Sequence, residues 1–274
     1  KEKNRHYVDI AKFLAAAGVN VPDIYYHDPD EGLIWMQDLG GEDLWASRNA
    51  PWDDRRPLYE SALTEAAKMH TAATRRLDGS GLRLEREFGE QLYLWEQSYF
   101  FDNCLRAHFG LDEATVRRYA ELPAMQGIAV RLAALPRVLV HRDFQSQNIL
   151  IRDGEAWLID FQGMRPGLPH YDAASLLYDP YVTLSGAERA QLLEFYKRAA
   201  SARGMEVSGD FDSVFHHCAL QRLMQALGAY GFLGLQKGRP DFLVHIPAAR
   251  RSLREVAARI DGLDEFVALL DRLP

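Results

Sequence analysis

Apolar residues follow two different periods along this chain, and each period predicts a different kind of structure. Near the N-terminus, two short apolar runs at 21–26 and 33–37 flank a turn-forming segment around Pro29 and Gly32, which predicts a pair of strands. Over most of the remaining chain, apolar residues recur every three to four positions, which predicts helices. The combined pattern predicts an α+β fold with a small part containing strands and a mainly helical body.

The helical periodicity divides into several segments. We expect helices over residues 3–17, 55–74, 85–109, 112–134, 185–202, 211–235, 242–260 and 264–273, with a break in the fourth near Pro123. A shorter helix is predicted over 172–177, where Asp172 would be the N-cap. The segment 164–170 is rich in proline and glycine and is expected to be a loop.

Two β-type runs in the middle of the chain lead into polar residues of the kinds that catalytic sites use. The first run ends in His141-Arg142-Asp143, with Asn148 after four intervening residues, and the second ends in Asp160-Phe161-Gln162-Gly163. An Asp-Gly pair at 153–154 predicts a tight hairpin that joins them. We therefore expect Asp143, Asn148 and Asp160 to lie in one small volume.

Oxygen-bearing side chains in such a group suit magnesium and phosphate. Mg²⁺ takes few protein oxygens and keeps other positions for water and phosphate, so Asn148 and Asp160 are candidate metal ligands. Asp143 would then hold a substrate hydroxyl and accept its proton during phosphoryl transfer. The order H-R-D-x-x-x-x-N followed by D-F-x-G matches the catalytic and metal loops of kinases. A structural hairpin with solvated carboxylates is the alternative interpretation.

Composition narrows the choice of partners. The 274 residues suffice for one large domain or two small ones, and 47% of them are hydrophobic, as in ordinary globular proteins. A net charge of -7 gives no electrostatic reason to expect nucleic acid or an anionic membrane as a partner. No apolar run approaches the length of a membrane span. Two distant cysteines without a signal peptide indicate reduced thiols and a cytoplasmic protein.

The motifs at 141–148 and 159–162 resemble those of the aminoglycoside phosphotransferase and choline kinase-like family. That family has the protein-kinase-like fold, and the resemblance runs from the strand at 21–26 to the C-terminal helices. Within the family, segments 38–40, 171–181 and 221–228 are most similar to bacterial cell-wall sugar kinases. Those enzymes phosphorylate N-acetylmuramate and N-acetylglucosamine at the anomeric hydroxyl.

The resemblance implies a role for each matching residue. Asp143 would be the catalytic base, Asn148 and Asp160 would bind Mg²⁺, and His141 would support the catalytic loop. Asp172 would accept backbone N–H groups of that loop. The backbone of the hinge would receive the adenine of ATP, and the sugar would be bound further along the chain. The hinge residues are Met36, Gln37, Asp38 and Leu39, and the candidate sugar ligands are Asp179, Tyr181 and Arg222.

The same resemblance predicts the domain organisation. Residues 1–40 would be a remnant of the N-lobe with the hinge, and residues 41–274 would be the helical C-lobe. The phosphate-covering loop and strand lysine of the family have no counterpart here, since Lys1 and Lys3 are flanked by polar residues. We therefore expect that the natural protein is longer at its N-terminus.

Other functions remain open at this level. The acceptor could be an aminoglycoside, choline, ethanolamine or homoserine, and a non-catalytic nucleotide-binding protein is an alternative of another class. An aminoglycoside site should be acidic, and a choline site should contain an aromatic cage. Retention of both Asp143 and Asp160 favours an active enzyme. The leading hypothesis is an ATP- and Mg²⁺-dependent kinase of a small molecule.

Overall fold

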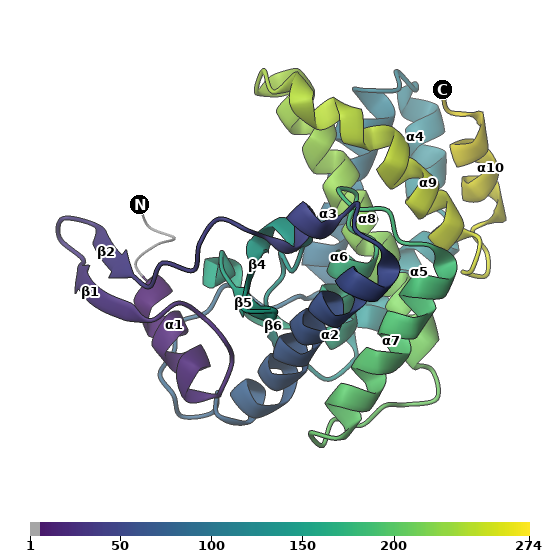
Figure 1. The fold of residues 1–274 in the computed structure, drawn as a ribbon. Coiled ribbons are helices and arrows are strands. Elements are labelled where there is room, and N and C mark those ends of the chain that lie inside the picture. Colours follow the sequence, from purple (N-terminus) through teal and green to yellow (C-terminus); the bar gives the residue numbers. More distant parts are fainter. Residues whose placement is uncertain (1–5) are drawn as a thin grey trace. The chain divides into compact units, whose positions relative to one another are not determined.

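The computed structural model describes residues 6–274, which form two compact units (Figure 1). Unit 1 comprises the chain up to Glu87 together with Arg137–Leu177 and Val182–Ser208, and unit 2 comprises Phe88–Pro136, Tyr178–Tyr181 and Gly209–Pro274. Lys1, Lys3 and the predicted start of the first helix lie outside the described residues. The mixture of helices with three two-stranded sheets in the described part of the chain agrees with the predicted α+β class.

Unit 1 begins with helix α1 (Tyr7–Ala16) and an antiparallel hairpin of β1 (Ile24–Asp28) and β2 (Leu33–Met36). The hairpin was predicted, but its first strand begins three residues later than expected. Val21 is buried instead of paired, and Pro22 has no N–H group to donate to a ladder. The hairpin closes at its base, where the Gln37 N–H donates to the carbonyl of Asp23 over 2.7 Å.

Two long helices of unit 1, α2 (Trp52–Lys68) and α7 (Gly186–Ser201), pack side by side (Figure 1). A capping box between Ser185 and Glu188 starts α7, and Glu188 also pairs with Arg55 of α2 over 2.8 Å. The predicted single helix over 55–74 is divided, because α2 continues into a π-helical turn at Met69–Ala73. A π turn contains an extra residue and often occurs at functional sites.

Short strands in unit 1 carry the sequence motifs. Strand β3 (Val138–Val140) pairs with β6 (Arg165–Gly167), and β4 (Ile149–Arg152) pairs with β5 (Glu155–Leu158), both antiparallel. The predicted Asp-Gly turn joins β4 to β5, and both of its residues have positive φ, as a type I′ turn requires. The segment predicted as a loop contains β6, because a two-stranded edge tolerates proline and glycine better than a central strand does.

Helix α6 (Pro169–Leu177) follows β6 and corrects one prediction. Asp172 is not the N-cap of this helix but lies within its first turn. The helix starts earlier than predicted because proline at its first position needs no hydrogen-bond partner for a backbone N–H. The side chain of Asp172 therefore does not cap the N-terminus of α6, and Asp172 is fully buried.

Unit 2 is organised around helix α8 (Phe211–Gln236) (Figure 1). Its other helices are α3 (Glu90–Phe100), α4 (Glu113–Ala120), α5 (Pro123–Ala133), α9 (Ile246–Ala257) and α10 (Asp264–Arg272). The break predicted near Pro123 separates α4 from α5. A Cβ at Gly231 of α8 would lie 2.1 Å from the Asn103 carbonyl oxygen, so only glycine permits this close approach.

Two predicted helices of unit 2 are shorter than expected. The aromatic helix starts at Glu90, not at residue 85, and its end from Phe101 to Arg106 is π-helical. The helix predicted over 242–260 consists of a 3₁₀ turn at Pro240–His245 and then α9.

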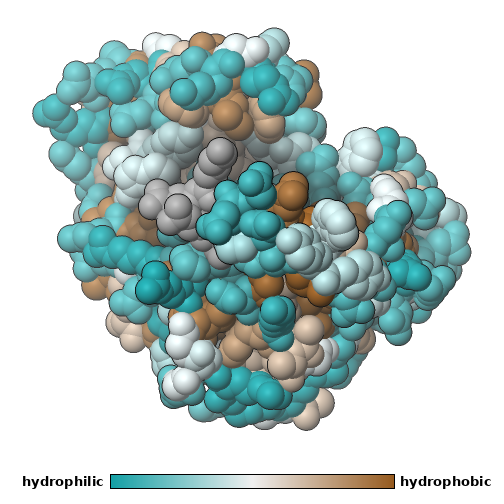
Figure 2. Space-filling model, turned by 90° about the vertical axis from the view of Figure 1, so that its left-hand side faces the viewer, coloured by the Kyte–Doolittle hydropathy of each residue, from teal (hydrophilic) through white to brown (hydrophobic). Residues whose placement is uncertain are grey.

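The surface and the interior agree with the composition of an ordinary globular protein. The face shown in Figure 2 is largely hydrophilic, and hydrophobic residues gather only in small areas of it. The side chains of Cys104 and Cys218 are both buried, and they form no disulfide within the described residues. Within residues 6–274, no helix is both long enough and apolar enough to cross a membrane.

Candidate active site

The carboxylate of Asp172 anchors the start of the loop that contains Asp143. One oxygen accepts the backbone N–H of His141 over 2.7 Å, and the other accepts that of Arg142 over 2.9 Å. Arg142 has a φ of 78°, in the left-handed region that costs a non-glycine residue roughly 1–2 kcal/mol. Hydrogen bonds to a buried carboxylate are strong enough to offset this cost. The hydrogen bonds expected of Asp172 from the family resemblance are therefore present.

His141 joins this loop to the segment that contains Asp160. Its buried ring places Nε2 2.9 Å from the carbonyl oxygen of Ile159. The N–H of Ile159 in turn donates to the carbonyl of Asn148 over 3.1 Å. These hydrogen bonds join the two loops directly, and they fix the position of one loop relative to the other.

The three residues predicted to bind metal or act as the base, Asp143, Asn148 and Asp160, lie close together in unit 1. An added Cβ at Gly163, in the loop after Asp160, would lie 3.8 Å from Asp143 Oδ2. The Asp143 carboxylate also accepts a hydrogen bond from Arg142 Nη1 over 2.6 Å. Both side chains are partly exposed, so the carboxylate can be reached by a substrate while the guanidinium holds its orientation.

The orientation of Asn148 suits a metal ligand. Its Nδ2 donates to the Asp143 carbonyl over 2.9 Å, which leaves the amide oxygen available to accept or coordinate. Asp160 is exposed, and Gln162 Nε2 donates to its Oδ1. One carboxylate and one amide oxygen are hard ligands, and they leave most positions of an octahedral ion for water and phosphate. The side chains of Asn148 and Asp160 therefore fit an Mg²⁺ ion whose remaining positions would be taken by water and phosphate oxygens.

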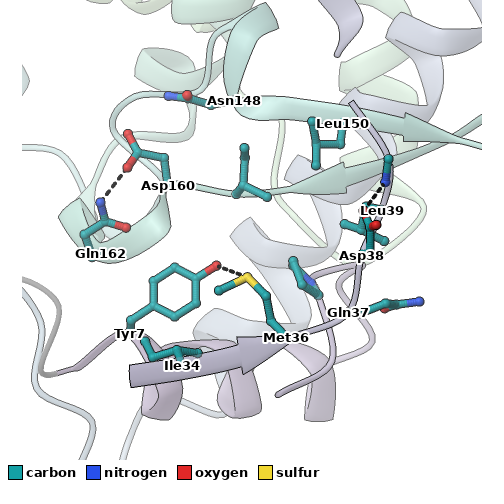
Figure 3. A pocket seen from close by; sticks show the side chains of 13 residues that line it. Tyr7, Ile34, Met36, Gln37, Asp38, Leu39, Asn148, Leu150, Asp160 and Gln162 are labelled. Atoms are coloured by element: carbon teal, nitrogen blue, oxygen red, sulfur yellow. Dashed lines mark hydrogen bonds between the residues drawn. The ribbon is translucent and has the colours of Figure 1, made fainter. Parts of the chain in front are cut away.

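A cavity of about 600 Å³ lies beside these two side chains (Figure 3). Figure 3 shows Asn148 and Asp160 at one end of the cavity, and Asp38 and Leu39 at the other. Apolar side chains form much of the wall between the two ends. All four predicted hinge residues line the cavity, together with Ile34, Leu150 and Ile159.

Two polar lining residues, Tyr7 and Gln162, were not predicted from the sequence. The ring of Tyr7 stacks on Phe161 with centroids 4.5 Å apart, and its hydroxyl lies 3.9 Å from the sulfur of Met36. Burial, with the nearby charge of Asp160, raises the pKa of Tyr7 to about 12, so the phenol remains a neutral donor. Gln162, which donates a hydrogen bond to Asp160, lies at the variable position of D-F-x-G. Its place inside this motif was the signal that could have identified it.

The predicted sugar ligands Asp179, Tyr181 and Arg222 gather in unit 2. Asp179 and Arg222 are almost fully buried, and Asp179 Oδ1 accepts the N–H of Tyr181 over 3.0 Å. The Tyr181 ring packs edge-on against His245 and Tyr230, with centroids 4.6 and 6.1 Å apart. Burial raises the pKa of Tyr181, and the charges of Asp179 and Arg222 act on it in opposite directions. His245 and Tyr230 were missed because they lie far from Tyr181 along the sequence, in segments whose periodicity predicts only helices.

Comparison with known proteins identifies relatives of this chain among the phosphotransferases. Residues 1–207 match the model of the phosphotransferase enzyme family designated APH. N-acetylmuramate/N-acetylglucosamine kinase of Pseudomonas aeruginosa is 28% identical over 280 residues, covering 100% of this chain and 79% of the relative. The Pseudomonas putida enzyme of the same name is 27% identical over 282 residues, with the same coverage of each chain.

Solved structures show the same fold. A putative aminoglycoside phosphotransferase from Ralstonia eutropha matches with a TM-score of 0.63 at 16% identity, covering 93% of this chain and 83% of that one. An amicoumacin kinase in complex with AMP-PNP, Ca²⁺ and Ami matches with a TM-score of 0.60 at 16% identity, covering 91% and 75%. The fold is therefore that of the protein-kinase-like phosphotransferases, and this chain belongs to the APH phosphotransferase enzyme family.

Proposed function

We propose that this phosphotransferase uses ATP and Mg²⁺ to phosphorylate an N-acetylated amino sugar, N-acetylmuramate or N-acetylglucosamine, at the anomeric hydroxyl. The observation that carries the choice of acceptor is the match, along the whole chain, to kinases named for these two sugars. The predicted nucleotide and catalytic residues of unit 1 support the reaction class. ATP is available in the cytoplasm, so the proposed reaction assigns the enzyme to that compartment.

The two ends of the cavity suggest how ATP would bind. Adenine fits the end beside the hinge, where Leu150 and Ile34 offer apolar contact and Met36 to Leu39 offer backbone groups. The phosphates would then extend toward Asn148 and Asp160. Mg²⁺ held there would neutralise the charge that develops on the phosphate oxygens.

Asp143 would act on the acceptor hydroxyl. The sugar oxygen O1 forms a bond to the γ-phosphorus, the bond from that phosphorus to the bridging oxygen of ADP breaks, and the hydroxyl proton passes to the Asp143 carboxylate. A hemiacetal hydroxyl is more acidic than an ordinary alcohol, so a carboxylate is a sufficient base. Arg142, at 2.6 Å, would keep the carboxylate aimed during this transfer.

The residues around Tyr181 supply the features that a sugar site needs. Sugars present apolar C–H faces as well as hydroxyls, which suits aromatic rings beside a few fixed polar groups. The aromatic rings alone would also suit choline, because quaternary ammonium groups bind to aromatic cages. The positive charge of Arg222 acts on both Tyr181 and Tyr230, and so does the negative charge of Asp179. Because these two charges oppose one another, charge does not decide between the acceptors, and the choice of a sugar rests on the match to the named kinases.

A panel of acceptors tests this proposal. ADP release should be at least about tenfold faster, a difference of about 1.4 kcal/mol in the barrier, with N-acetylglucosamine or N-acetylmuramate than with kanamycin, choline or homoserine. The assay couples ADP to NADH oxidation, and samples without acceptor correct for ATP hydrolysis. Faster turnover of choline or kanamycin than of either sugar would replace the proposed acceptor.

A further inference from the structure

A buried series of polar side chains in unit 1 leads from helix α7 to the catalytic loop. The hydroxyl of Tyr196 lies 2.6 Å from His70 Nδ1, and His70 Nε2 lies 3.0 Å from Asp172 Oδ2. The side chains of all three residues are fully buried. Asp172 is the residue whose carboxylate holds the N–H groups of His141 and Arg142. The series therefore ends on the backbone that immediately precedes Asp143.

The direction of each hydrogen bond follows from the chemistry of the groups. An ionised Asp172 carboxylate is an acceptor only, so His70 Nε2 carries the proton that it donates. Nδ1 of a neutral imidazole is then an acceptor, and the Tyr196 hydroxyl donates to it. Burial and the charge of Asp172 raise the pKa of Tyr196 well above its usual range, so the phenol keeps this proton.

The backbone around His70 is also unusual. His70 lies in the π-helical turn at Met69–Ala73, which places it differently from a residue of an uninterrupted helix. Just after this turn, Thr74 Oγ1 accepts the N–H of Leu139 in β3 over 2.9 Å. The same short segment thus contacts the strand that enters the catalytic loop and, through His70, the carboxylate that holds the loop.

We propose that Tyr196 and His70 are positioning residues for phosphoryl transfer, because together they fix the orientation of the Asp172 carboxylate. Both oxygens of Asp172 must face the loop to hold Arg142 in its left-handed conformation. His70 fixes Oδ2, and Tyr196 fixes the His70 ring. Without them the carboxylate could rotate, and Asp143 would lose its alignment. This inference rests on the proposed function of Asp143, since neither residue touches a substrate.

Tyr196→Phe tests the series with little change in packing, because it removes only the hydroxyl. We expect kcat for the sugar to fall about tenfold, the usual order for loss of one buried hydrogen bond, while KM for ATP and for the sugar changes less than twofold. His70→Gln should lower kcat further, by about 100-fold, because small displacements of reacting groups are costly. Tyr59→Phe is the matched control, since Tyr59 is a fully buried tyrosine of α2 outside this series.

Two measurements without an acceptor separate this inference from the proposed function. Amide exchange at His141 and Arg142 should become faster in Tyr196→Phe than in the wild type, and should not change in Tyr59→Phe. A long-range ¹H–¹⁵N spectrum should show His70 as the Nε2-protonated tautomer, with its Nδ1 signal shifted in Tyr196→Phe. Wild-type exchange and kcat in Tyr196→Phe, or equal losses in Tyr59→Phe, would overturn the inference. Absence of sugar turnover in the wild type, with the exchange effect present, would overturn only the proposed acceptor.

Discussion

Asp143→Asn should slow sugar phosphorylation by orders of magnitude and leave the affinity for ATP within about twofold of the wild type. The amide keeps the size of the side chain but cannot accept the hydroxyl proton at the catalytic loop. General-base catalysis contributes typically about 10²–10⁴-fold in rate, so kcat should fall by that order. ATP affinity should persist because the side chain of Asp143 is not among the groups that line the nucleotide cavity. Single-turnover assays and calorimetric titration with ATP measure the two quantities.

The matched control for this variant is Asp153→Asn. Asp153 is an exposed carboxylate in the turn between β4 and β5, and asparagine tolerates its positive φ of 53°. This change also removes one carboxylate charge from unit 1, but at a turn outside the catalytic loop, and we expect wild-type kcat. Turnover in Asp143→Asn that equals the control would remove Asp143 from the mechanism.

Asp160→Ala should remove the dependence of ATP affinity on magnesium. Asp160 is the carboxylate that faces Asn148 at one end of the cavity, and it would join the ion to the protein. Its loss should weaken ATP binding in magnesium by about 100-fold, or about 2.7 kcal/mol, and should reduce transfer by orders of magnitude. Calorimetry of ATP binding with and without MgCl₂ measures this difference.

Two further variants make the test specific. Asp160 has a φ of 59°, so alanine adds backbone strain at this position, whereas Asp160→Asn removes the charge at a residue type that tolerates it. Both variants should lose the magnesium effect. Asp38→Asn is the control, because Asp38 lines the same cavity but binds the Gly40 N–H at the hinge end. An Asp160 variant that keeps the magnesium effect would show that its carboxylate is structural.

The parts of the site that were predictable from sequence are those formed by short segments. The hairpin that brings Asn148 near Asp160 has an Asp-Gly turn and only a few residues on each side, so local patterns determine its register. The strand pair before the predicted hinge was found in the same way, from two apolar runs that flank a turn. The break at Pro123 follows from the missing N–H of proline.

Contacts between segments that are far apart in the sequence left no sequence pattern from which they could be predicted. Tyr196 lies 126 residues from His70, and His70 lies 102 residues from Asp172, so only the packing of α2, α6 and α7 against one another brings them together. Asp172 had a plausible local interpretation as a helix cap, and tertiary hydrogen bonds decided otherwise. The π turn at His70 uses the same residue types as an ordinary helix, so periodicity could not distinguish the two.

The most direct test of the proposed reaction follows the reducing end of the sugar. Phosphorylation at C1 converts the hemiacetal into a phosphate ester, which no longer reduces copper or ferricyanide reagents. The protein is incubated with ATP, MgCl₂ and N-acetylglucosamine or N-acetylmuramate, and reducing sugar and ADP are measured in the same samples. We predict that reducing sugar disappears in a one-to-one ratio with ADP formation, and that Asp143→Asn shows neither change. ADP formation with an undiminished reducing end would place the phosphate on another hydroxyl and contradict the proposed anomeric chemistry.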